Sequence, residues 1–182
     1  HVGVIKALEA QGIRPDIIVG SSAGSVIAAL VASGATGNEL NRLALNLDEA
    51  TIADWGLPFS GRFGGLIKGD ALQNMINREV QNRAIEQMRI PLGIVATELQ
   101  SGKGVLFRSG NTGLAVRASC SVPGVFQPVM IDVEIDGKKY QELHVDGGAI
   151  AQLFLYPPSI DISASNIKRE RRAYIIRNAR LD

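Results

Sequence analysis

A serine between glycines is the residue of this sequence best placed for nucleophilic chemistry. Residues 20–24 read Gly-Ser-Ser-Ala-Gly, between an apolar run that ends at residue 19 and a run of small residues from 25 to 33. In a G-x-S-x-G pattern, a strand, a sharp turn and a helix expose the central serine hydroxyl. Gly20 and Gly24 let the strand and the helix approach closely, because they carry no side chain. We therefore predict Ser22 as a nucleophile.

The helix that begins near Ala23 adds electrostatic support to this interpretation. Free backbone N–H groups at a helix N-terminus stabilise negative charge, including the charge that develops on an attacked carbonyl. The N–H of Ala23 is the oxyanion donor that this sequence identifies. Two other interpretations fit the same five residues, a helix N-cap and an anion-binding turn without covalent chemistry.

A serine hydroxyl needs a base within hydrogen-bond reach, and histidine is the usual one. The sequence contains two histidines, His1 and His144. In the serine-acid-histidine order of ordinary α/β-hydrolases, Asp132 or Glu134 would have to orient His144. Both acids alternate with apolar residues along a strand, which is typical of an exposed strand face. The spacing around His144 likewise predicts a partly exposed strand residue.

Asp146 is the other candidate base. It ends the strand predicted over residues 140–145, and Gly147 and Gly148 follow it. Strand ends carry catalytic groups in α/β sheets, although Asp-Gly is also a common turn dipeptide. A carboxylate is a weak base, so this chemistry requires desolvation or a tight hydrogen bond to the serine.

Helices and strands that alternate along the sequence must position these residues. The length of 182 residues predicts a single domain over 1–182. Helices are predicted over 2–9, 23–31, 38–47, 70–81, 85–88 and 114–119, with Asp70 as a cap, and strands over 17–19, 91–96, 105–107, 129–135, 139–145 and 173–176. Residues 136–137 are a two-residue hairpin turn, Asp-Gly. The pattern predicts an α/β protein, a three-layer α/β/α fold with a central, mostly parallel sheet.

Composition excludes several function classes. The net charge of +1 gives no overall attraction to nucleic acid or an anionic membrane, and residues 168–172 are interpreted as a solvated basic face. Cys120 is the only cysteine, and no clustered ligand set is present, so we expect no metal or other cofactor. No apolar run reaches the length of a membrane span, and no signal peptide is visible.

The aromatic-rich stretch 52–68 is predicted to be a long loop whose aromatic residues pack on the core, with a lid or lipid-contacting surface as the alternative. These features favour a cytoplasmic or membrane-peripheral location. They do not indicate an oligomeric state.

Several of these motifs together resemble the patatin-like phospholipases, which use a Ser-Asp dyad without histidine. The resemblance lies in residues 20–24 and 146–148, and extends over 1–8, 91–99 and 117–126. It implies that Ser22 is the nucleophile and that Asp146 is its base. The implied substrates are fatty acyl esters of phospholipids, lysophospholipids or related lipids, cleaved through an acyl-enzyme during transient contact with a membrane surface.

The resemblance also has limits. The family's glycine-rich oxyanion loop normally precedes the helix that begins near His1, and relatives often continue after Gly148 with an Asn-Pro-Val-Pro-like run, where this chain reads differently. We therefore expect a domain incomplete at both ends, with part of its oxyanion hole missing. Two alternatives stay open: a conventional esterase that uses His144, and a non-catalytic regulatory or interaction domain on the same fold.

Overall fold

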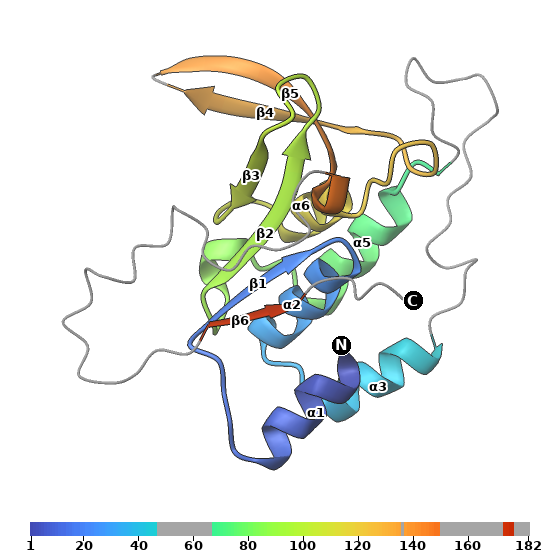
Figure 1. The fold of residues 1–182 in the computed structure, drawn as a ribbon, viewed down its shortest axis with the longest axis vertical. Helices are drawn as coiled ribbons and strands as arrows, with labels where there is room; N and C mark the ends of the chain where they lie inside the picture. Colours follow the sequence, from blue (N-terminus) through green and yellow to red (C-terminus); the bar gives the residue numbers. More distant parts are fainter. Residues whose placement is uncertain (47–66, 136, 150–172, 177–182) are drawn as a thin grey trace.

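The computed structural model describes residues 1–46, 67–135, 137–149 and 173–176 (Figure 1). Its helices are α1 Val2–Ala10, α2 Ala23–Ser33, α3 Gly37–Asn46, α5 Asp70–Glu79, η1 Ile85–Gln87, α6 Thr112–Ser119 and η2 Gly147–Ala149. Its strands are β1 Ile17–Ser21, β2 Leu92–Glu98, β3 Gly104–Phe107, β4 Val129–Ile135, β5 Lys138–Asp146 and β6 Ala173–Ile176. The helices and strands predicted over these residues are confirmed, with ends shifted by a few residues. The basic stretch 168–172, and the predicted loop up to residue 66, lie outside the described residues.

The strands form one mixed sheet centred on β1 and β2. β1 pairs in parallel with β2 and with β6, whereas the pairs β2–β3, β2–β5 and β4–β5 are antiparallel. The predicted α/β class is confirmed, but among the described strands parallel pairing is limited to the two sides of β1. For the pairs β2–β3 and β4–β5 the connections explain the difference, because the turns after β2 and β4 are too short for the crossover that a parallel pair requires.

The apolar core lies where the helices meet the sheet. One cluster of buried residues includes Ile18 of β1, Leu92 and Ile94 of β2, and side chains from all five described α-helices. On the other face of the same strands Val19 and Val95 are buried as well, at 4% and 1% exposure. The continuous apolar run of β2 is therefore covered on both faces, as strands in the centre of an α/β sheet are.

Candidate active site

The ends of β1 and β5 meet along one edge of β2. β3 pairs with β2 over residues 94–97, so β1, which pairs with residues 92–95, and β5, which pairs with 96–98, share the opposite edge. β1 runs parallel to β2 and β5 runs against it. Ser21 therefore lies opposite Val95, and Asp146 lies opposite the next residue, Ala96. This arrangement brings the residue after β1 next to the last residue of β5.

Ser22 occupies the sharp turn between β1 and α2. Its backbone has φ 53 and ψ −134, a positive φ that non-glycine residues rarely adopt. Gly20 makes this turn sterically feasible, because a Cβ there would lie 2.5 Å from the carbonyl oxygen of Gly24 and 2.6 Å from Cα of Ser25. A strand, a strained serine and a helix thus follow one another here in the order that the G-x-S-x-G pattern predicts.

The Ser22 hydroxyl donates a hydrogen bond of 2.5 Å to Oδ2 of Asp146. Both residues are buried, each at 6% exposure. The other carboxylate oxygen, Oδ1, accepts the backbone N–H of Gly148 at 2.6 Å. A Cβ at Gly147 would lie 2.4 Å from the carbonyl oxygen of Val95, so this glycine permits the close passage of the chain beside β2. The structure thus brings together the serine and the aspartate that the sequence singled out.

Residues 119–121, at the end of α6, support both members of this pair. The Ser119 hydroxyl accepts the backbone N–H of Ser22 at 2.8 Å and donates to the carbonyl of Val95 at 2.5 Å. The carbonyl of Ser121 accepts the N–H of Asp146 at 2.9 Å. Sequence reasoning missed this role, because two of the three bonds involve backbone groups of the pair. The serines on either side of Cys120, inside the resembling segment, were the available indication.

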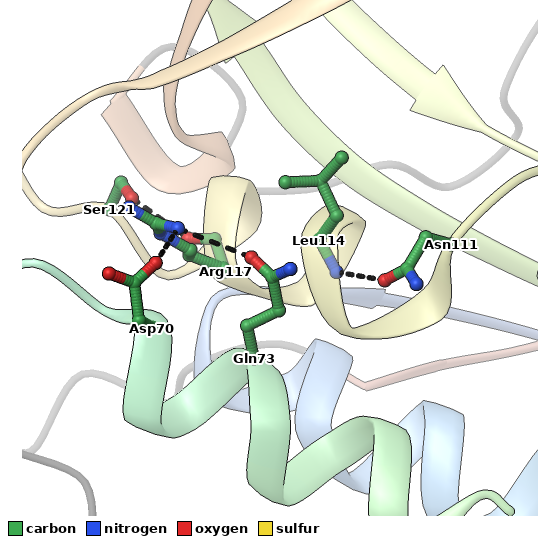
Figure 2. Close-up of polar contacts among 6 residues, drawn as sticks. All are labelled: Asp70, Gln73, Asn111, Leu114, Arg117 and Ser121. Carbon is green, nitrogen blue, oxygen red and sulfur yellow. Dashed lines mark hydrogen bonds and ion pairs between the residues drawn. The ribbon is translucent and has the colours of Figure 1, made fainter. Parts of the chain in front are cut away.

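Side-chain contacts at both ends of α6 hold this supporting segment in place (Figure 2). Oδ1 of Asn111 accepts the N–H of Leu114 at 2.8 Å and caps the helix. Arg117 forms an ion pair with Asp70 and donates to Gln73 at 3.2 Å, which ties α6 to α5. Asp70 was predicted as a cap for α5, but it is the first residue of that helix, and its carboxylate pairs with Arg117 instead.

The N-terminus of α2 directly follows the serine. The first N–H groups of a helix have no acceptor within the helix, and Ala23 and Gly24 provide the first two here. Ser25 is turned back toward the loop, with its N–H and hydroxyl both donating to the carbonyl of Ser22, at 2.8 and 2.6 Å. The N–H of Ala23 is the first of the helix and directly follows Ser22, at the end of α2 where negative charge is favoured.

Cys120 is a second nucleophile type near the site, but its protonation state argues against a reactive thiolate. Burial raises the pKa of the Cys120 thiol to about 12, and the negative charge of Asp146 acts in the same direction. A thiol with such a pKa stays protonated at neutral pH and reacts slowly.

An apolar cavity of about 510 Å³ opens at Ser22. Its walls come from the start of α1, from α2, α3 and α5, and from the segment after α6; they include Val26, Leu40, Leu72 and Phe126. Cavities of this size and character are typical of small-molecule binding sites. The site therefore combines a hydrogen-bonded hydroxyl, a buried carboxylate and an apolar chamber.

The structure corrects the prediction for His144. Its side chain is completely buried, not partly exposed, and its ring packs against Phe107 with centroids 5.2 Å apart. Nε2 lies 3.4 Å from Oε2 of Glu142, yet neither ring nitrogen has a hydrogen-bond partner. Asp132 is exposed on β4 and bonds Gln141, so it does not orient the histidine. The Ser22 hydroxyl donates its hydrogen bond to Asp146. Among the described residues, no contact joins His144 to Ser22.

Burial lowers the pKa of His144, against the opposing influence of Glu142 and Glu98. The ring is therefore neutral when folded, and the unfolded chain takes up a proton first as the pH falls below about 6.5. Stability should be retained above that pH and decrease as the pH falls toward the folded-state pKa.

We expect His144→Phe to remove this component of the pH dependence. At pH 7.5 its free energy of unfolding should lie within about 1 kcal/mol of the parent, since no buried hydrogen bond is lost. At pH 5.5 the free energy of unfolding of His144→Phe should exceed that of the parent, because the variant has no buried ring that must stay neutral. Denaturant unfolding at the two pH values measures both quantities, and equal pH slopes for the two chains would contradict the prediction. The carboxylates also contribute to the pH dependence of stability, but they are the same in both chains, so the difference between the two slopes isolates His144.

The sequence of this chain is similar to those of several known proteins. The family model described as patatin-like phospholipase matches residues 1–157. An uncharacterized NTE family protein of Mycobacterium tuberculosis is 36% identical over 157 residues, which cover 86% of this chain and 41% of that protein. Patatin-like phospholipase domain-containing protein 6 of Homo sapiens is 28% identical over 155 residues, covering 84% of this chain and 11% of that protein.

The crystal structure of VipD from Legionella pneumophila has a similar fold, with a TM-score of 0.62 at 14% identity over 97% of this chain and 46% of VipD. The chain thus spans less than half the length of these relatives. None of the described helices is long and apolar enough to cross a bilayer.

Proposed function

Because the chain belongs to the patatin-like phospholipase family, we propose that it carries a serine acyl hydrolase site that cleaves fatty acyl esters of phospholipids, lysophospholipids or related lipids. The 2.5 Å hydrogen bond between the Ser22 hydroxyl and Asp146 is the observation that carries this proposal. It supplies the two functions that ester cleavage by a covalent route requires, a nucleophile and an adjacent base.

In the first half of the reaction, Ser22 Oγ attacks the ester carbonyl carbon while its proton passes to Oδ2 of Asp146. The carbonyl oxygen becomes negatively charged, and the N–H of Ala23 at the start of α2 stabilises it. Asp146 then gives the proton to the alcohol oxygen as the ester bond breaks. The alcohol leaves, and the acyl group remains on Ser22.

In the second half, water takes the place of the alcohol. The water oxygen attacks the acyl carbon while Asp146 accepts a proton from the water. Asp146 then returns the proton to Ser22 Oγ when the fatty acid leaves. Burial of the carboxylate and the fixed N–H of Gly148 keep Asp146 in one orientation through both halves. This preorganisation helps a carboxylate to act as the base.

The cavity beside Ser22 supports an acyl rather than a polar substrate. Its lining is formed mainly by aliphatic side chains of α2, α3 and α5, among them Ile27, Leu43 and Met75. Burial of methylene groups against such walls is favourable by about 0.8 kcal/mol each. The chamber therefore suits the hydrocarbon part of a lipid ester, with the head group on the solvent side.

Release of fatty acid from a lysophospholipid tests the proposal. We expect turnover with the lysophospholipid ester and none with its ether analogue, because the ether offers no carbonyl to attack. The activity should persist in EDTA and be lost after treatment with a fluorophosphonate. Activity that is unchanged by the fluorophosphonate would contradict a serine nucleophile.

A further inference from the structure

The apolar cavity follows one face of α2 away from the nucleophile. Ala23, Val26, Ile27 and Leu30 all line it, at the spacing of residues that share a helix face. Ala23 is next to Ser22, whereas Leu30 lies seven residues further on, about 10 Å along the helix axis at 1.5 Å per residue. A residue further along α2 therefore lies further from the ester carbonyl that Ser22 attacks.

The lining of the cavity becomes more buried along α2. Ala23 is exposed, Val26 and Ile27 are half-buried, and Leu30 is 5% exposed. Leu40 of α3, at 1% exposure, also lines the cavity and belongs to the same core cluster as Leu30. On this face of α2, the residue furthest from Ser22 is therefore the one least accessible to solvent.

We propose that this face of α2 acts as a ruler for acyl chain length, with Leu30 as the residue that sets its end. This inference rests on the proposed function of Ser22. An extended chain advances about 1.2 Å per bond, so an acyl chain lying along α2 reaches Leu30 after about eight carbons. It passes Val26 after about four carbons, because Val26 is only three residues beyond Ala23.

The ruler predicts that a bulky residue shortens the accepted chain according to its position on α2. Val26→Phe should weaken binding of acids longer than butyrate, whereas Leu30→Phe should weaken only acids longer than octanoate, in each case by about tenfold or more. Leu30→Ala removes the end wall and should favour long chains relative to the parent. Val4→Phe is the matched control, since Val4 is 61% exposed and does not line the cavity.

Two readouts separate this inference from the function on which it rests. In a Ser22→Ala background, fatty acids from butyrate to palmitate compete with a fluorescent acyl probe, so binding is measured without catalysis. With Ser22 intact, hydrolysis of the matching p-nitrophenyl esters is measured for each variant. Thermal unfolding identifies any variant that fails to fold. If a phenylalanine variant does not fold, Leu30→Ala still tests the ruler, because it should lengthen the accepted acyl chain.

Cut-off lengths that follow the order Val26→Phe, Leu30→Phe, parent, Leu30→Ala support the ruler. Variants that change binding equally at every chain length, or no more than Val4→Phe does, overturn it even if ester hydrolysis continues. Ordered binding without any hydrolysis would retain the ruler and overturn the proposed catalytic function.

Discussion

Asp146→Asn is expected to reduce kcat/KM for acyl ester hydrolysis by about 10²- to 10⁴-fold, the usual contribution of a positioned general base. The amide keeps the size of the side chain and can still accept the N–H of Gly148, but it cannot take the proton of Ser22. The loss should therefore appear in turnover, with folding preserved. Steady-state kinetics, together with a thermal unfolding curve, measure the two effects separately.

Asp132→Asn is the matched control for this substitution. Asp132 lies on β4, exposed, with its carboxylate accepting a hydrogen bond of 3.0 Å from Gln141. The same charge is removed at a position remote from the Ser22 hydroxyl, so activity should stay at the parent level. Equal losses in Asp132→Asn and Asp146→Asn would show that net charge, rather than a base at Asp146, governs the rate.

Ser22→Ala is expected to have the larger effect, a loss of activity on the order of 10⁶-fold, the size of loss known for removal of the nucleophile of a serine protease. No acyl-enzyme can form without the hydroxyl. The neighbouring Ser21 offers a closely matched control, because its hydroxyl is buried without a hydrogen-bond partner. Ser21→Ala should leave turnover unchanged and leave stability equal or higher by about 1 kcal/mol. Residual activity in Ser22→Ala comparable to that in Ser21→Ala would exclude Ser22 as the nucleophile.

The part of the site that sequence predicts best is local. The glycines around Ser22 are required by contacts only four or five residues apart in the chain, such as that between Gly20 and Gly24. The hairpin that carries Asp146 to its place follows from the alternation in β4 and β5 and the glycine between them. Such short-range constraints are visible in the pattern of residue types.

Other features depended on pairings between distant segments. The alternation of Glu142, His144 and Asp146 predicted an exposed strand face, but that face is covered near Phe107, and His144 is buried. Periodicity shows that residues share a face and not which face becomes buried. The hydrogen bonds that Ser119 and Ser121 accept from the backbone N–H groups of Ser22 and Asp146 likewise follow from the tertiary placement of α6.

The sheet illustrates the same limit. Alternating strands and helices predicted mostly parallel pairing, whereas β5 returns against β2. That reversal is what directs the end of β5 toward the end of β1. The departure from the simple prediction is therefore the feature that allows a serine and an aspartate, 124 residues apart, to form a hydrogen bond.

The rate at which a fluorophosphonate labels the protein tests the two-residue catalytic unit most directly, when measured for the parent, Asp146→Asn and His144→Phe and assigned to a residue by peptide mass. We predict labelling at Ser22, strongly slowed in Asp146→Asn and close to the parent rate in His144→Phe. Labelling that persists in Asp146→Asn but disappears in a folded His144→Phe would contradict it and favour a histidine-dependent esterase.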